Sequence, residues 1–101
     1  AEEHLADLIV HAEPDLVSQL GEWRLAPLQG VRPGQRERLT DTLACWLRHR
    51  GQRAPMAAEL HVHEQTIGYR VAQLRDLFGE ELDDPDVRFE LELVLRARHV
   101  R

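Results

Sequence analysis

Apolar residues recur along most of the chain with the spacing of amphipathic helices. In the first segment, from Leu5 to Ala12, they fall at positions i, i+3, i+4 and i+7. Pro14 ends this helix and is well placed to open a second short one, for which Gly21 is the expected stop. The stretch over residues 22–34 has no period and two clusters of proline and glycine, so we predict a packed connecting loop there.

The middle of the chain shows one long helical pattern followed by two helices close together. Leu39, Leu43 and Trp46 mark the long helix, and Gly51 lies where its C-terminal cap is expected. A short helix over residues 54–60 follows, and after a gap of three residues the pattern restarts and runs to Gly79. Two helices with so short a connection cross steeply, which is the arrangement of a helix-turn-helix.

The last segment is ambiguous by its period alone. Phe89, Leu91 and Leu93 alternate with polar residues as in a strand. Asp84 and Pro85, in contrast, suit the N-cap and the first turn of a helix. The length of the segment, which continues to residue 99, favours a helix that is buried on two sides.

These patterns predict an all-α fold, a small domain of about five or six helices that contains a helix-turn-helix. We expect N-terminal helices and a connecting loop over residues 1–34, and the helix-turn-helix part over residues 35–101. A length of 101 residues with 43% hydrophobic and 31% charged content fits one compact domain. The first residue is Ala rather than Met, so we expect a piece of a longer protein, with part of its function upstream.

No membrane partner is expected from the sequence. The apolar runs are far shorter than the roughly 20 residues that cross a bilayer, and no basic-then-apolar leader opens the chain. The single cysteine, Cys45, permits no disulfide within the chain. We therefore expect a cytoplasmic protein.

Charge is distributed unevenly along the chain. The net charge of −5 excludes a generally polybasic nucleic-acid binder, so any such surface must be local. Between Cys45 and Arg75 five arginines stand against two acidic residues, for a net charge of +3, whereas each flank carries −4. Positive charge therefore gathers around the predicted helix-turn-helix, as binding to phosphate requires.

The second helix of the motif has one face turned away from the predicted core. At about 100° per residue from Ile67, this face is polar near the helix start. Its members are Gln65, Tyr69, Ala72 and Asp76, flanked by Thr66, Gln73 and Gly68. Gln pairs with adenine edges, Thr offers a hydroxyl and a methyl group, and a helix N-terminus donates amides to phosphate, which is the chemistry that reads a DNA major groove.

A resemblance to a known family covers the stretch from Leu39 to Arg101. Its most specific marks are the TL..WL helix that ends in Gly51, the A.ELHVH turn, T..YR in the second helix, and the tail LDDPDVRFELELVLR. In these marks the chain closely resembles the C-terminal helix-turn-helix domain of the PucR and CdaR group of bacterial transcriptional regulators. The resemblance implies a domain that binds promoter DNA and is attached to an upstream region that senses a metabolite or another signal.

Carried over by position, the resemblance makes residues 57–60 the supporting helix, 61–63 the turn and 64–78 the recognition helix. Two departures stand out. The family commonly has a Pro-Asn pair and a basic residue where this chain has Glu64, Gln65 and Gly68. Glu64 repels phosphate, and Gly68 removes a groove contact and costs about 1 kcal/mol of helix propensity. We therefore expect lower affinity or an unusual operator, or else a copy of the domain that is kept for packing alone.

The sequence thus predicts a sequence-specific, double-stranded DNA-binding domain of a bacterial transcriptional regulator, not an enzyme. We expect it to act as a homodimer on paired half-sites, with an effector bound by an upstream domain. Base contacts are expected from Gln65, Thr66 and Tyr69, although packing of Tyr69 against its own helix is an equal alternative for that side chain. Phosphate contacts are expected from His63, Arg48, Arg50, Arg53 and Arg70, and His63 is also a candidate cap of the second helix.

Two other classes of function compete with this interpretation. A helical protein-interaction or dimerisation module that has lost DNA binding is the main alternative. A zinc site is the other, since Cys45 and His49 lie one helical turn apart and His61 and His63 follow in the turn. A lone cysteine on a largely apolar helix usually serves as a small hydrophobe, so we expect no metal and no cofactor. Glycine-rich phosphate loops, GxSxG and HExxH are missing from the sequence, and the acidic residues 80–86 lack the spacing of a calcium loop.

Overall fold

The computed structural model describes residues 2–99, and the side chains within residues 7–98, as a purely helical chain. The predicted all-α fold is therefore confirmed. Six α-helices and two short 3-10 helices follow in this order: α1 (Glu2–Ala12), α2 (Pro14–Arg24), η1 (Ala26–Leu28), α3 (Pro33–His49), α4 (Arg53–Leu60), α5 (Glu64–Phe78), η2 (Gly79–Asp83) and α6 (Pro85–His99).

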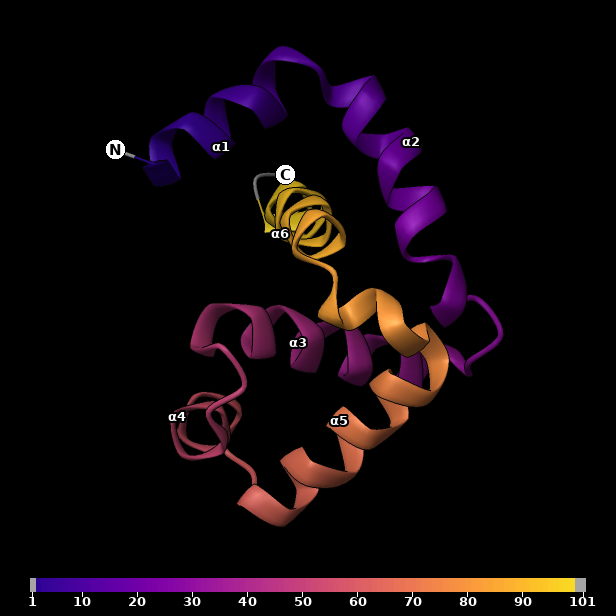
Figure 1. Cartoon of the computed structure of the whole chain (residues 1–101), viewed down its shortest axis with the longest axis vertical. Coiled ribbons are helices and arrows are strands. Elements are labelled where there is room, and N and C mark those ends of the chain that lie inside the picture. The colour runs from indigo at the N-terminus through magenta and orange to yellow at the C-terminus, as the bar shows by residue number, and fades with distance from the viewer. Residues whose placement is uncertain (1, 100–101) are drawn as a thin grey trace.

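The N-terminal helices lie over α6, and α3, α4 and α5 form the opposite part of the molecule (Figure 1). The expected stop at Gly21 was wrong, since α2 continues to Arg24. A Cβ on Gly21 would lie 3.2 Å from Cγ1 of Val94, so this glycine lets α2 approach α6 closely. The predicted loop over residues 22–34 accordingly holds the end of α2, the 3-10 turn η1 and, at Pro33 and Gly34, the start of α3.

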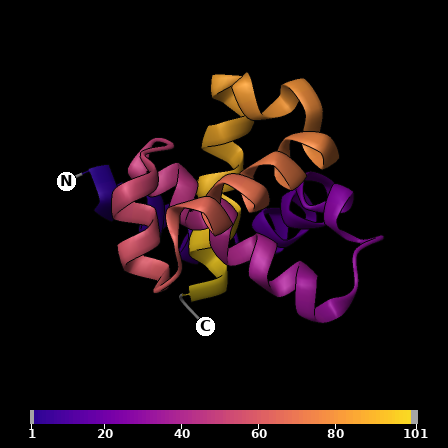
Figure 2. The same ribbon diagram turned by 90° about the horizontal axis from the view of Figure 1, so that it is seen from below.

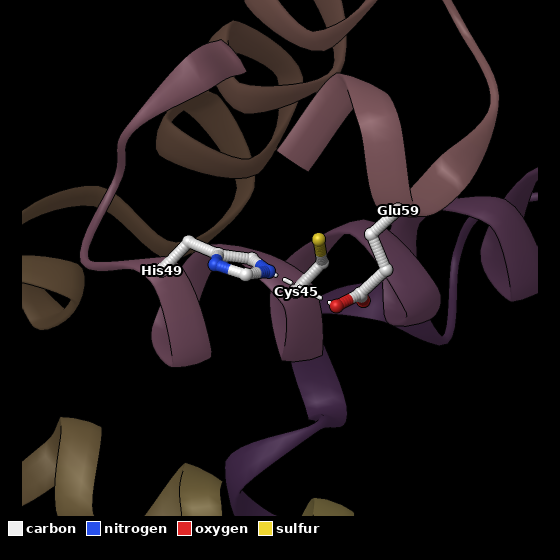
Figure 3. A group of neighbouring side chains, drawn as sticks. All are labelled: Cys45, His49 and Glu59. Carbon is white, nitrogen blue, oxygen red and sulfur yellow. Dashed lines mark hydrogen bonds and ion pairs between the residues drawn. The ribbon is translucent and has the colours of Figure 1, made fainter. Parts of the chain in front are cut away.

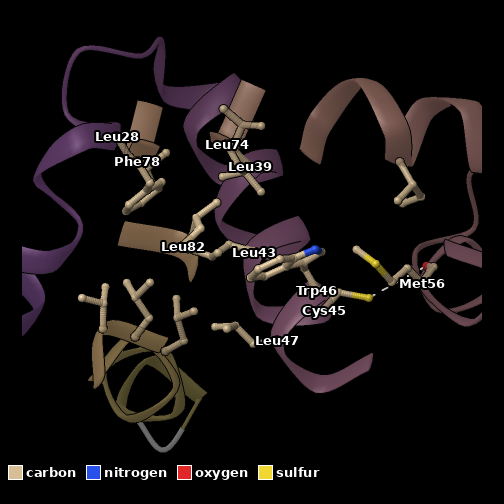
Figure 4. Packing of buried hydrophobic residues seen from close by; sticks show 14 of the residues in the cluster. Leu28, Leu39, Leu43, Cys45, Trp46, Leu47, Met56, Leu74, Phe78 and Leu82 are labelled. Carbon is tan, nitrogen blue, oxygen red and sulfur yellow. Dashed lines mark hydrogen bonds between the residues drawn. The ribbon is translucent and has the colours of Figure 1, made fainter. Parts of the chain in front are cut away.

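One apolar cluster joins α3 to the helices around it (Figure 4). Leu43 of α3, Met56 of α4 and Ile67 of α5 are each 0% exposed. The left-handed residues Arg50 and Gly51 end α3, with φ of 53° and 80°. The C-cap is thus Arg50, one residue before the predicted Gly51, and Gly51 follows in the same turn, where its positive φ is unstrained because it has no Cβ.

The last segment is a helix, as its length and its first residues predicted. The backbone N–H of Asp86 donates to Oδ1 of Asp84 over 2.9 Å, which satisfies one of the amides that a helix start leaves without an internal partner. Leu91 and Val94 are buried between the N-terminal helices and α3, in line with burial on two sides. Phe89 is the exception, since it is 57% exposed. No helix in residues 2–99 is long and apolar enough to cross a membrane.

Candidate nucleic-acid interface

α4 and α5 lie in front of the other helices when the molecule is seen from below (Figure 2). α4 ends at Leu60, and His61 takes a left-handed conformation with φ of 56°. The chain turns there, and the N–H of Val62 bonds back to the carbonyl of Ala57 over 3.1 Å. Three residues thus connect the two helices, and the predicted bounds of the second helix, 64–78, are those of α5.

The crossing of α4 and α5 depends on apolar contacts from both helices. Ala57 is 8% exposed, and its small side chain suits a close approach between the two helix backbones. Ile67 is buried on the inner side of α5, and so is Leu74 two turns further on. Leu60 and Val62 pack against the same cluster. Burial of these side chains fixes α5 on its support and determines which of its faces is exposed to solvent.

His63 caps the start of α5. Its Nδ1 accepts a hydrogen bond from the backbone N–H of Gln65 over 3.0 Å. One of the two roles expected for this residue is therefore confirmed. An Nδ1 that accepts leaves the ring proton on Nε2, so the exposed side of the ring is a hydrogen-bond donor.

The outward face of α5 carries Gln65 and Tyr69, both exposed, with Tyr69 at 65%. Nε2 of Gln65 donates to the hydroxyl oxygen of Tyr69 over 3.2 Å. This bond links residues one helical turn apart and holds both side chains on the outer face. Thr66, beside them, is half-buried. The structure therefore brings the three residues predicted for base contacts together at the N-terminal end of α5.

The four predicted phosphate-binding arginines differ in their surroundings. Arg48 forms an ion pair with Glu59. Within the described part of the chain, Arg50, Arg53 and Arg70 make neither an ion pair nor a side-chain hydrogen bond. Arg50 and Arg53 are exposed, and Arg70 is half-buried.

Arg53 comes from the first turn of α4 but lies against α5. Its Nη1 is 3.1 Å from the point that a Cβ on Gly68 would occupy. Gly68 lies one turn after Glu64 and beside the outward face of α5. The missing side chain at position 68 thus makes room for a guanidinium supplied by the neighbouring helix.

A cluster of three side chains lies between α3 and α4 and is formed by Cys45, His49 and Glu59 (Figure 3). Cys45 and His49 are among the residues for which the sequence analysis considered a zinc site. The third donor is Glu59 rather than a histidine of the turn. Spacing along the chain did not indicate Glu59, because its position depends on how α4 crosses α3. Nε2 of His49 lies 2.9 Å from Oε1 of Glu59.

The titration of this cluster reflects its contacts. Hydrogen bonds from Arg48 and then His49 lower the pKa of Glu59 to about 2. Burial raises the pKa of the Cys45 thiol to about 12, with Glu59 adding to the effect. Glu59 is therefore a carboxylate at neutral pH, and Cys45 is a protonated thiol that donates weakly to the carbonyl oxygen of Met56 over 3.9 Å.

An exposed helix, its supporting helix and a turn of three residues define a helix-turn-helix domain. Residues 39–97 match the model of the PucR C-terminal helix-turn-helix domain. Because the match covers more than half of the chain, the chain belongs to this family. It is a family of transcription-regulator domains rather than a class of enzymes.

Two relatives place this domain within longer proteins. The chain is 31% identical over 86 residues to the purine catabolism regulatory protein of Bacillus subtilis (strain 168), an alignment that covers 83% of this chain and 16% of that protein. It is 34% identical over 67 residues to an uncharacterized protein in the pkwA 5' region of Thermomonospora curvata, covering 66% of this chain and 37% of the relative. The chain therefore spans well under half of the length of either relative. No solved structure gives a significant match.

Proposed function

We propose that the chain binds double-stranded DNA in a sequence-specific manner and places α5 in the major groove. The observation that carries this proposal is the two-sided character of α5: Ile67 is 0% exposed on one side and Tyr69 65% exposed on the other. The outward side presents an amide and two hydroxyls near the helix start, where backbone amides and the helix dipole favour phosphate. Family membership supports the same function.

In this proposal the side chains divide into two groups. Gln65, Thr66 and Tyr69 contact base edges, because they lie together on the outward face of α5. Phosphates are contacted by side chains around the edge of that face, namely His63, Arg50, Arg53 and Arg70, and by Arg48 once it leaves Glu59. Glu64, exposed at the first position of α5, opposes phosphate there and lowers the affinity.

The proposed DNA binding also implies where the domain acts and with what partners. The domain acts in the cytoplasm of a bacterial cell, as part of a transcriptional regulator whose upstream region binds the effector. Two copies bind as a homodimer, because helix-turn-helix domains read half-sites that are about one helical turn of DNA apart. Residues 1–34 serve as the connection to the upstream region or as the surface of the dimer, and residues 35–101 form the DNA-binding part.

A selection from a random duplex library, followed by affinity measurements over a range of salt, tests this function. We expect enrichment of one sequence class, and affinity that falls as salt rises because bound phosphates release counterions. Arg50→Ala should reduce the salt dependence by about one phosphate contact. Equal binding to all duplexes, or no binding at low salt, would contradict the proposal.

A protein-interaction module is the second candidate, and exposed apolar side chains favour it. Leu16 and Trp23 of α2 are 59% and 63% exposed, and Phe89 of α6 is 57% exposed. If association rather than DNA binding is the function, the chain should form no complex with DNA and show no preference among duplexes, whereas self-association alone is expected of both candidates. Light scattering during size-exclusion chromatography, with and without a selected duplex, separates the two candidates.

A further inference from the structure

Cys45, His49 and Glu59 offer three different kinds of metal-binding atom from two helices. Cys45 and His49 lie one turn apart on α3, and Glu59 faces them from the last turn of α4. Their donor atoms, a sulfur, a ring nitrogen and a carboxylate oxygen, all lie within 4.8 Å of one another. Figure 3 shows the imidazole and the carboxylate turned toward each other beside the thiol.

The burial of the cluster changes from one side to the other. Cys45 is 0% exposed, whereas the side chains of His49 and Glu59 are 29% and 36% exposed. An ion can therefore reach the cluster from solvent past the imidazole and the carboxylate and meet the sulfur at the inner end. A zinc ion held by three protein ligands usually takes a water molecule as its fourth ligand, which here would come from the exposed outer side.

We propose that this cluster binds one zinc ion through Sγ of Cys45, Nε2 of His49 and a carboxylate oxygen of Glu59. Thiolate, imidazole and carboxylate are the side chains that ligate zinc, whereas calcium and magnesium prefer oxygen ligands alone. Ligand bonds of about 2.0 to 2.3 Å place the donors of a tetrahedral site about 3.3 to 3.8 Å apart. Because the donor atoms lie within 4.8 Å of one another and the pair His49–Glu59 is 2.9 Å apart, side-chain rotations that move the donors by about 1 Å would give this spacing.

Zinc binding must replace the interactions that the cluster makes without the ion. The thiol proton of Cys45 is released to solvent, and the contact between His49 and Glu59 opens as both turn their lone pairs to zinc. Arg48 gives up its ion pair with Glu59, which its side chain can do because it is 51% exposed. The alternative is that Arg48, Glu59 and His49 form only a surface ion-pair network, which predicts no affinity for zinc.

The bound ion would also link two helices of the motif. α3 supplies two ligands from its last turns, and α4 supplies the third. An ion that binds the folded chain and not the unfolded chain raises the midpoint of thermal unfolding. We therefore expect zinc to stabilise the packing of α4 on α3 without any requirement for DNA.

Titration of the whole chain with Co²⁺, a spectroscopic substitute for zinc, tests the proposal directly. We expect one equivalent of cobalt to bind, with a thiolate-to-cobalt charge-transfer band and the visible bands of tetrahedral cobalt, and one equivalent of zinc to abolish both. His49→Gln and Glu59→Gln should each weaken binding at least tenfold, and Cys45→Ala should remove the charge-transfer band. His61→Asn, which alters an exposed histidine in the turn outside the cluster, should bind as the unaltered chain does.

Circular dichroism of each variant shows whether it has folded. His49→Gln changes a half-buried side chain near a helix end, so it decides the question even if Cys45→Ala fails to fold. No charge-transfer band at saturating cobalt overturns the proposal, as does binding that survives His49→Gln or Glu59→Gln unchanged. Loss of binding in His61→Asn would also overturn the proposed set of ligands.

Discussion

The guanidinium of Arg53 lies directly over Gly68, with its Nη1 3.1 Å and its central carbon 3.3 Å from the position of an added Cβ. The two residues belong to different helices of the motif, α4 and α5. A positive charge is thus placed beside the exposed face of α5 by a residue outside that helix. Because the contact depends on the missing side chain, a methyl group at position 68 is enough to disturb it.

Gly68→Ala should therefore separate helix stability from DNA binding. Alanine is favoured over glycine in a helix interior by about 1 kcal/mol, and the far end of an arginine moves away easily, so stability should stay equal or rise. DNA affinity should fall modestly, because the added methyl group displaces the Arg53 guanidinium by a few tenths of an ångström from the position at which we propose that it contacts phosphate. Thermal unfolding and fluorescence anisotropy with a selected duplex measure the two effects.

Gly34→Ala is the matched control, since Gly34 is also helical and an added Cβ there meets only Arg38 at the ordinary distance of 3.9 Å. It should leave DNA affinity unchanged. Arg53→Ala should lower affinity more than Gly68→Ala does, because it removes the charge, and the double variant should lose no more than Arg53→Ala alone. If Arg53→Ala weakens binding and Gly68→Ala does not, the contact between the two residues has no part in DNA binding.

Gln65→Ala should reduce discrimination among DNA sequences rather than general affinity. The Gln65 amide is exposed on the outward face of α5, and a bidentate contact to a base contributes about 1 to 3 kcal/mol of discrimination. The preferred base at one position of the selected site should become degenerate. Repeating the selection from a random library with the variant provides the measurement.

Gln19→Ala, an exposed glutamine on α2, serves as the control for this change. It should leave the selected sequence as it is. An unaltered base preference in Gln65→Ala would remove Gln65 from the base-reading group, whereas a uniform loss over all sequences would assign it to a phosphate instead.

The helix-turn-helix was predictable from the sequence because its determinants are local. Ile67 and Leu74 recur on one face, and Gly79 follows directly where α5 ends, so both the bounds and the exposed face of α5 could be read from the chain. Asp84 and Pro85 likewise indicated the start of α6. Such signals act within a few residues and survive in almost any tertiary setting.

The contacts between helices were not predictable in the same way. Glycine signals a helix end as readily as a close packing contact, so Gly21 was interpreted as a stop although it lies against Val94. The approach of Arg53 to Gly68 and of Glu59 to His49 depends on the angle at which α4 crosses its neighbours. No spacing along the chain encodes that angle, so the sequence does not indicate Glu59 as a member of the proposed zinc site.

Leu74→Ala should destabilise the domain strongly. Leu74 is 1% exposed on the inner side of α5, and removal of a fully buried leucine side chain costs about 2 to 5 kcal/mol. Leu16→Ala makes the same chemical change at a side chain that is 59% exposed, and should alter stability by no more than about 0.5 kcal/mol. Urea unfolding followed by circular dichroism compares them, and equal losses would show that α5 is not anchored by its inner face.

The ion pairs of Glu59 should make its contribution to stability disappear in acid. The pKa of Glu59 falls from 4.5 to about 2 on folding, chiefly through Arg48 and then His49. A carboxylate with a lowered pKa in the folded state stabilises the fold fully above pH 4.5, and this contribution is lost as pH falls from 4.5 toward 2.

Glu59→Gln, which cannot ionise, should therefore be less stable than the unaltered chain at neutral pH and approach it in acid. Urea unfolding of the metal-free chain from pH 7 down to about pH 2.5 measures the difference, from which the shared titration of other acids cancels. Glu37→Gln, an exposed change on α3, should show no such convergence, and a constant difference for Glu59→Gln over this range would mean that its ion pairs do not stabilise the fold.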